Sequence, residues 1–339
     1  AALEAALGLR ARQNLMAIQP GDVHSTAADT SALAAWVGFA PSTPVQTGVA
    51  LTATQTAYTF TCGPVDLQLS FTSPLLIRDP DLISRPVSYI TAKCKANDGK
   101  QHSAELYFGV STSLAVNNVS QKVAAGGYRS GQLNILKAGT TEQPVLQKKG
   151  DDLRIDWGYV YVAIPERDHP VQYITPAKTA FNAFLSNTYR PNTGNQEGND
   201  LMLNTVLSIG KVGADIVEKI MLLGYDDLYA IQYFGQNLKA WWRDRDGAGI
   251  EKELTNAYTD YGKIMARCKE WDNTIYNDAL KAGGEAYAQL CVLAYRQSIS
   301  AHKLLKSPQG EILFMSKENY SNGSINTVDI TYPSAPLYL

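Results

Sequence analysis

The sequence lacks several features that would each assign it to a class of protein. No apolar run is long enough to span a bilayer, so we expect no membrane-spanning segment. The formal net charge is only −2, and the charged residues are spread along the chain. That distribution argues against nucleic acid or an anionic membrane surface as a partner, because both attract basic patches. A glycine-rich phosphate loop, a His-Glu-x-x-His motif and a Cys-His-Asp constellation are also missing, and we assign no metal ligand.

Cysteine is scarce, and its spacing is not that of a metal or redox motif. The four cysteines are Cys62, Cys94, Cys268 and Cys291, with no Cys-x-x-Cys among them. Buried free thiols are one interpretation, and a disulfide between Cys62 and Cys94 is the other.

A starting methionine and a signal peptide are absent too. The first residues, "AALEAALGLRARQNLMAI", resemble the middle of a protein, and the last segment ends directly after a strongly apolar region. We therefore expect a processed or truncated piece of a longer protein.

The pattern of the chain changes twice, which predicts three parts. Residues 1–48 are rich in Gly, Pro, Ser and Thr and read as a connector with a short helix. Residues 49–224 carry short alternating runs at near-even spacing, which predicts an antiparallel β-sandwich. Within this part we expect a short helix at 177–190 and a final strand pair, 201–213 with 214–227, joined through Gly210 to Gly213.

Residues 225–339 are predicted to be helical. Residues 251–271 show the spacing of an amphipathic helix. Residues 278–305 are apolar nearly all round, which is typical of a helix buried among other helices. The core stripe that we expect along this helix is Tyr287, Leu290, Cys291, Ala294, Ser298, Ala301 and Leu305. Its partners are expected from sequence beyond Leu339 or from another chain.

Several long segments resemble the secreted glutaminase A family of fungi and gut bacteria. They include "LGYDDLYAIQYFGQNLKAWW", "YAQLCVLAYRQSISAHKLL" and "EILFMSKENYSNGSINTVDITYPSAPLYL" in the C-terminal part. "SPLLIRDPDLISRPVSYIT", "VLQKKGDDLRIDWGYVYVA" and "LNTVLSIGKVG" are similar to the family's β-rich N-terminal module. The resemblance runs from about Val49 to Leu339.

The resemblance implies an α+β multidomain fold, in which an antiparallel β-sandwich precedes a helical region that begins an α/α toroid of six hairpins. It also implies an amidohydrolase that converts L-glutamine and water to L-glutamate and ammonia without a cofactor, in a secreted or periplasmic location. Because the toroid has barely begun at Leu339, we expect its missing C-terminal sequence as a partner and the chain alone to be inactive.

The segment "SKENYSNGSINTVD", residues 316–329, is the expected catalytic segment. Amide hydrolysis needs a base, an acid and donors for the developing oxyanion. Glu318 or Asp329 is the candidate base or acid, and Lys317, Asn319 and Asn322 are candidate donors, with Lys317 in the catalytic set. The alternative is a solvated hairpin with Asn322-Gly323 at its turn.

Two further residues are candidate substrate ligands. Arg296 suits a substrate carboxylate because guanidinium binds carboxylate with two prongs, although a structural pair with a carboxylate such as Glu318 fits equally well. Trp241 could line a pocket for a polar ligand, or Trp241 and Trp242 could pack between domains. Ser300-x-x-Lys303 matches the Ser-x-x-Lys of serine-dependent glutaminases, but the accompanying Lys-Thr-Gly is missing and we discount it.

Two other functions stay open at this point. A sandwich followed by a six-hairpin toroid also occurs in glycoside hydrolases, which need paired carboxylates in one cleft. A non-catalytic binding or scaffolding module would instead show no polar cleft around Glu318.

Overall fold

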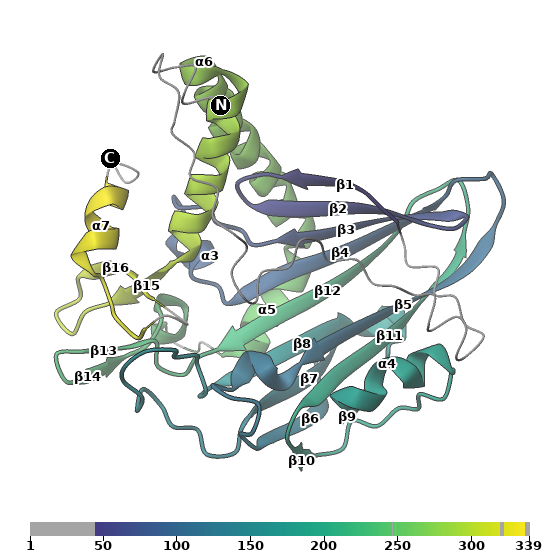
Figure 1. The fold of residues 1–339 in the computed structure, drawn as a ribbon, viewed down its shortest axis with the longest axis horizontal. Helices are drawn as coiled ribbons and strands as arrows, with labels where there is room; N and C mark the ends of the chain where they lie inside the picture. Colours follow the sequence, from purple (N-terminus) through teal and green to yellow (C-terminus); the bar gives the residue numbers. More distant parts are fainter. Residues whose placement is uncertain (1–44, 246, 248, 319–321, 336–339) are drawn as a thin grey trace, which may run out of the picture. The chain divides into compact units, whose positions relative to one another are not determined.

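Two antiparallel sheets form the main body of this computed structural model, which describes residues 45–245, 247, 249–318 and 322–335 (Figure 1). The larger sheet has nine strands in the order β1-β2-β3-β4-β12-β8-β7-β6-β10, and the smaller has the order β5-β11-β9. The nine strands are β1 (Val45–Leu51), β2 (Gln55–Cys62), β3 (Val65–Thr72), β4 (Val87–Ala96), β6 (Val123–Ser130), β7 (Leu133–Thr140), β8 (Tyr159–Pro165), β10 (Gln196–Gly198) and β12 (Val217–Asp226). The three are β5 (His102–Ser111), β9 (Val171–Pro176) and β11 (Leu201–Val212).

The core between the sheets follows from the alternation in these strands. Ile90, Val162 and Met221 of the larger sheet join one buried cluster with Leu203 and Leu207 of the smaller one. Successive strand residues point to opposite faces, so each strand supplies every second side chain to this layer. The predicted antiparallel sandwich is confirmed, and so is the short helix, α4 (Ala177–Leu185).

The predicted pairing of the last two strands is wrong. β11 pairs with β5 and β9, whereas β12 pairs with β4 and β8, so the two consecutive strands lie in opposite sheets. Alternation shows that a segment is a half-buried strand, but it does not identify its neighbour.

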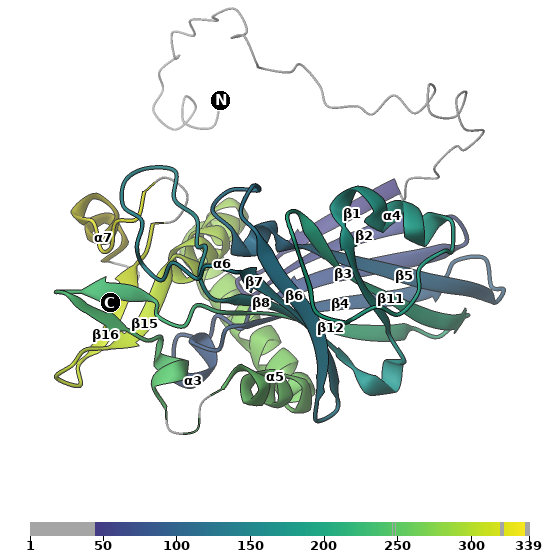
Figure 2. The same cartoon turned by 90° about the horizontal axis from the view of Figure 1, so that it is seen from below.

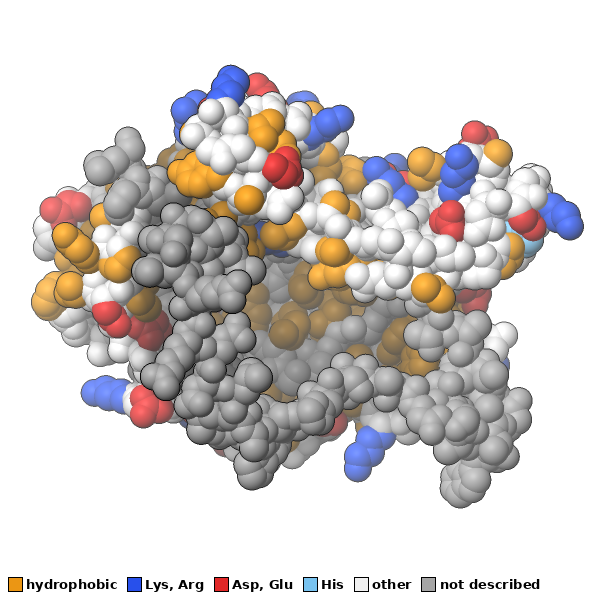
Figure 3. Space-filling model, turned by 45° about the horizontal axis from the view of Figure 1, so that its top comes forward, with side chains coloured by type: hydrophobic (Ala, Val, Ile, Leu, Met, Phe, Trp, Pro, Cys, Tyr) orange, Lys and Arg blue, Asp and Glu red, His pale blue; other side chains and the backbone are white. Residues whose placement is uncertain are grey.

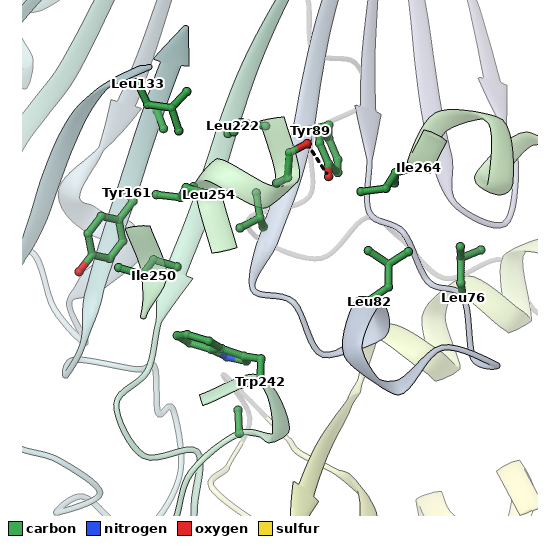
Figure 4. Close-up of a cluster of buried hydrophobic side chains, with 14 of the residues drawn as sticks. Leu76, Leu82, Tyr89, Leu133, Tyr161, Leu222, Trp242, Ile250, Leu254 and Ile264 are labelled. Atoms are coloured by element: carbon green, nitrogen blue, oxygen red, sulfur yellow. Dashed lines mark hydrogen bonds between the residues drawn. The ribbon is translucent and has the colours of Figure 1, made fainter. Parts of the chain in front are cut away.

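A second core lies on the other face of the larger sheet, under helix α5 (Ile250–Thr259) (Figure 4). Leu254 and Trp242 are buried there, and the Tyr89 hydroxyl donates a hydrogen bond to the carbonyl of Ala257 at 3.2 Å. Trp242 belongs to the short 3-10 helix η3 (Trp241–Asp244) and is buried in this core, whereas packing of Trp241 and Trp242 between domains stays a prediction. Figure 2 shows α4 and α5 on opposite sides of the sheets.

Helix α6 (Tyr261–Ser300) is a helical hairpin. Gly284 has φ 79° and ψ −174°, which is not a helical conformation. The Trp271 indole N–H donates to the Tyr295 hydroxyl at 2.9 Å. In a straight helix those two residues would be about 36 Å apart. The chain therefore reverses at Gly284, and the two arms pack side by side.

The prediction for residues 278–305 is wrong in its buried face and its length. The second arm buries Ala288, Val292, Tyr295 and Ile299, whereas Leu290 of the predicted stripe is 62% exposed. The helix ends at Ser300, and the next residues form a strand. A segment that is apolar nearly all round carries no periodic signal to show which face is inward.

Two β-hairpins interrupt the region that the sequence predicts to be helical. They are β13 (Ile231–Tyr233) with β14 (Gln236–Leu238), and β15 (His302–Lys306) with β16 (Ile312–Ser316). The remaining elements are α3 (Pro80–Ile83), α7 (Val328–Ser334), and the 3-10 helices η1 (Thr112–Ala115) and η2 (Glu166–Asp168). Residues 44–339 form one compact unit, and a domain boundary at 224/225 stays a prediction.

All four cysteines are free thiols. Cys62 on β2 and Cys94 on β4 are separated by β3, and two strand spacings amount to about 10 Å. A disulfide needs Cα atoms within about 7 Å, so these two cannot be joined without moving a strand. No helix in the described part of the chain has the length and apolar character needed to cross a membrane.

Candidate active site

A cavity of about 700 Å³ lies where the sandwich meets the β15–β16 hairpin. Its walls come from the β3–β4 connection, η1, the segment before β8 and the end of β12. Half of the lining residues are aliphatic or proline, and Arg85, Arg154, Asp227, Lys303 and Lys317 are charged. Figure 3 shows that one face of the molecule is hollowed, with hydrophobic side chains in its depth.

Asp227 follows the last residue of β12, and only 1% of its surface is exposed. Its Oδ2 lies 2.9 Å from the Lys303 ammonium. Its Oδ1 is enclosed and has no hydrogen-bond partner in the described part of the chain. Burial would raise the pKa of Asp227, but the charges of Lys303 and Lys317 outweigh it and hold that pKa below its ordinary value. The carboxylate is therefore ionised and has one oxygen left to accept a hydrogen bond.

Lys317 follows β16 and is held by the neighbouring backbone. Its Nζ donates to the carbonyl of Ala230 at 2.6 Å and lies 5.4 Å from the centre of the Trp157 ring. Burial, followed by the charge of Lys303, lowers the pKa of Lys317 to about 8, although Asp227 acts in the opposite direction. An amine with this pKa exchanges protons near neutral pH, which an ordinary lysine does not.

The backbone around Asp227 is fixed by close packing against the segment before β8. Gly158 has φ 78°, and a Cβ there would lie 2.1 Å from the carbonyl oxygen of Asp226. Only glycine permits this approach. The Tyr225 hydroxyl donates to the carbonyl of Trp157 at 2.7 Å, and the Trp157 indole N–H donates to the carbonyl of Tyr229 at 3.0 Å.

Asp226 and Asp227 bind different partners. Asp226 accepts from Arg243 of η3 at 2.6 Å and from the Leu228 N–H at 3.0 Å. Burial raises the pKa of Asp226 despite these two donors, whereas the pKa of Asp227 is lowered. Asp226 thus ties η3 to the sheet, and Asp227 is the carboxylate that lines the cavity.

Of the predicted catalytic residues, Lys317 lines this cavity. Glu318 does not: its carboxylate accepts from Asn322 Nδ2 at 2.7 Å and from Thr327 Oγ1 at 2.9 Å. Glu318 and Asn322 thus brace the segment that follows Lys317. Asp329 is exposed in the first turn of α7, and Asn319 lies outside the described residues. Catalytic roles for these residues stay predictions.

The predicted substrate ligands lie elsewhere. Arg296 donates to the carbonyl of Thr52 at 3.5 Å, and the nearby carboxylate is Asp272 rather than Glu318. Asp272 in turn accepts from Thr54 N–H at 2.8 Å, so this group fastens α6 to the β1–β2 turn. The Trp241 indole N–H donates to Asp81 Oδ1 at 2.8 Å. Substrate binding by Arg296 and Trp241 also stays a prediction.

Sequence reasoning missed the partners of Lys317. Asp227 lies 76 and 90 residues from Lys303 and Lys317, so no local spacing joins them. The Ser300-x-x-Lys303 spacing predicts that both residues share a helix face, but the helix ends at Ser300 and Lys303 is on β15, so they do not. The sequence does contain one signal for Asp227. Asp226 and Asp227 follow an apolar run that predicts a buried strand, and a buried carboxylate needs a partner of opposite charge.

Two known families match this chain. Residues 54–278 match a domain of unknown function (DUF5127), and residues 284–339 match the Glutaminase A six helical-hairpin domain. The second match starts at Gly284, where α6 reverses.

Among curated proteins, Glutaminase A of Aspergillus oryzae is 26% identical over 317 residues, which is 90% of this chain and 45% of that protein. A probable glutaminase of Arthroderma benhamiae is 32% identical over 90 residues, 26% of this chain and 10% of that protein. The chain thus spans less than half the length of the curated glutaminases that it matches.

Among solved structures, the heparan sulfate lyase HepC of Pedobacter heparinus aligns with a TM-score of 0.30 at 9% identity, over 57% of this chain and 24% of that one. This likeness is too distant to carry an argument. The two family matches cover most of the described residues, and the Aspergillus protein aligns across both. The chain therefore belongs to the glutaminase A family, with a β-rich DUF5127 domain followed by sequence of the six helical-hairpin domain.

Proposed function

We propose that this chain is part of an amidohydrolase that converts L-glutamine and water to L-glutamate and ammonia. Membership of the glutaminase A family supports the reaction. The single observation that supports the site is Lys317, a lysine with a pKa of about 8 beside a second lysine and a buried carboxylate in one cavity. Groups with strongly shifted pKa values in a cavity are candidates for proton transfer.

The residues of the cavity can divide the reaction among them. Neutral Lys317 takes a proton from the attacking water, whose oxygen bonds to the carboxamide carbon. The Lys303 ammonium stabilises the negative charge that develops on the carbonyl oxygen. Lys317 then returns the proton to the nitrogen as the C–N bond breaks, and ammonia leaves. Asp227 positions Lys303 through their ion pair at 2.9 Å.

Lys317 suits the role of base better than Glu318 or Asp329. Both oxygens of Glu318 already accept hydrogen bonds from side chains, and Asp329 is exposed on α7. Glycoside hydrolysis, which needs two carboxylates in one cleft, is less well supported. Asp227 is the only carboxylate among the described residues that line the cavity.

The test is ammonia release from L-glutamine by a full-length counterpart and by its Lys317→Met equivalent. Loss of a general base lowers kcat by about 100-fold or more. The matched control is the equivalent of Lys281→Met, which removes a lysine that is 80% exposed on the helical hairpin α6 and does not line the cavity. If the Lys317 variant stays within threefold of the parent while the folded fraction is unchanged, Lys317 is not the base.

The present chain belongs in the same assay. Because it spans 45% of the Aspergillus relative, we expect it to release little or no ammonia by itself. Rapid turnover by the short chain would contradict the proposal that further sequence is needed. A secreted or periplasmic location stays a prediction.

A further inference from the structure

Charged and aliphatic side chains both line the cavity. Lys303, Lys317 and Asp227 form its polar end, Arg85 and Arg154 are also among the lining residues, and Leu75 and Ile83 lie on the β3–β4 connection. The rest of the apolar lining comes from other parts of the chain and includes Leu114, Val116, Ile155, Val160 and Leu223. A ligand that fills this space must therefore carry a polar head and an apolar body.

The polar end of the cavity contains a buried carboxylate oxygen that is free to accept a hydrogen bond from a ligand. Asp227 is 1% exposed, and its Oδ1 accepts no hydrogen bond from the described residues. A buried acceptor without a partner is costly, and a ligand N–H group would remove that cost. The two lysines beside it suit a carbonyl or carboxylate oxygen. An amide or amino-acid head supplies both kinds of group.

The apolar end exceeds what free glutamine needs. Cavities of about 300–1,000 Å³ enclose ligands of drug size, and this one measures about 700 Å³. Glutamine has three methylene or methine carbons and would leave the aliphatic walls uncovered. Those walls would be filled by an acyl chain of medium length attached to the head.

We propose that the cavity accepts an N-acylated glutamine, with the amide head at Asp227, Lys303 and Lys317 and the acyl chain along the aliphatic walls. This inference rests on the proposed function and adds the substrate class. Each methylene group that enters an apolar wall strengthens binding by about fourfold. The acyl chain should therefore dominate affinity.

Calorimetric titration of the present chain tests the inference with four probes: L-glutamine, N-acetyl-L-glutamine, N-octanoyl-L-glutamine and octanoate. We expect N-octanoylglutamine to bind at least 30-fold more tightly than N-acetylglutamine, about the gain from two to three buried methylene groups. Octanoate should bind at least tenfold more weakly than N-octanoylglutamine, because it lacks the amide head. Equal affinity for the acetyl and octanoyl compounds, or for octanoate and octanoylglutamine, overturns the inference.

Two loop variants locate the acyl chain. Leu114→Asn alters an exposed cavity residue of η1, and should weaken binding of N-octanoylglutamine by about threefold to tenfold without changing that of N-acetylglutamine. Val119→Asn is the control, because Val119 is 65% exposed five residues later and does not line this cavity. Equal effects of the two variants on octanoyl binding would place the chain elsewhere.

Ammonia assays keep the two proposals separate. Tight binding of N-octanoylglutamine without turnover by a full-length counterpart would contradict the proposed function and leave the binding inference standing. Turnover of free glutamine at the same kcat/KM as the octanoyl compound would overturn the inference and leave the proposed function standing.

Discussion

Lys317 combines a shifted proton affinity with a defined place in the fold. Lys317 lines the cavity, where burial and the charge of Lys303 hold its pKa at about 8. An unfolded chain would return this lysine to a pKa of about 10.4. The folded state thus binds fewer protons than the unfolded state between these two values. Linkage then requires that the stability contribution of Lys317 rises with pH from about 8 to about 10.

We expect chemical labelling to detect this pKa directly. Trace acetylation across a pH series, read by mass spectrometry, should give a midpoint near pH 8 at Lys317. Lys303→Met should raise that midpoint, because a like charge is removed. Asp227→Asn should lower it, because an opposite charge is removed. The exposed Lys281 serves as the reference within each sample. A midpoint at Lys317 that does not move in either variant would contradict the electrostatic account.

The helical hairpin depends on a single backbone conformation. Gly284 has φ 79° and ψ −174°, a region that residues with a Cβ almost never adopt. The turn brings Trp271 and Tyr295 together, so it sets the position of the arm that leads to Ser300 and Lys303. A small element far from the charges therefore controls where one of them lies.

Gly284→Ala should lower the free energy of unfolding by about 1–3 kcal/mol, because alanine is strained at this φ and ψ. Gly262→Ala is the control: Gly262 lies in the same helix, and no atom comes within 4 Å of an added Cβ. This control should lose no stability, and it can gain up to about 1 kcal/mol. Urea unfolding measures both variants. Equal effects at the two glycines would mean that the turn at Gly284 is not strained by a side chain.

The sequence predicts those elements that a local residue pattern marks, and it does not predict contacts between residues far apart in the chain. Strands with clear alternation, such as β3 and β4, are evident from the residues. β6 was not, because Gly126 and Gly127 leave its middle without apolar side chains. The residues of β15 continue the apolar pattern of the preceding helix, and no glycine or proline marks the change from helix to strand after Ser300. Lys317 stood out as a cation in a polar cluster, whereas its pairing with Asp227 depends on tertiary contacts that no local pattern contains.

At the scale of the whole molecule, the described structure has exposed apolar side chains on the second arm of α6. Tyr287, Leu290 and Leu293 are 47%, 62% and 38% exposed. The helix is thus apolar on the outside as well as inside, and it is not enclosed as the sequence had suggested. Contiguous exposed apolar surface drives association in water.

We expect the chain to self-associate with rising concentration, and the double variant Leu290→Glu with Leu293→Glu to stay monomeric. Both substitutions are on exposed positions, so the midpoint of thermal unfolding should change little. Gln297→Glu adds charge at an exposed position of the same arm and is the control. Sedimentation velocity measures the effect. Identical concentration dependence in the parent and the double variant would show that this face does not mediate association.

The ion pair between Asp227 and Lys303 joins the two matched family segments, 54–278 and 284–339. Excising the β-rich part at residue 278 would separate Asp227 from both lysines and Trp271 from Tyr295. Removing one partner of a buried ion pair costs several kcal/mol where the remaining charge stays buried. The β-rich part matches a family of its own, but its Asp227 forms an ion pair with a lysine of the other matched segment. The two parts are therefore coupled electrostatically.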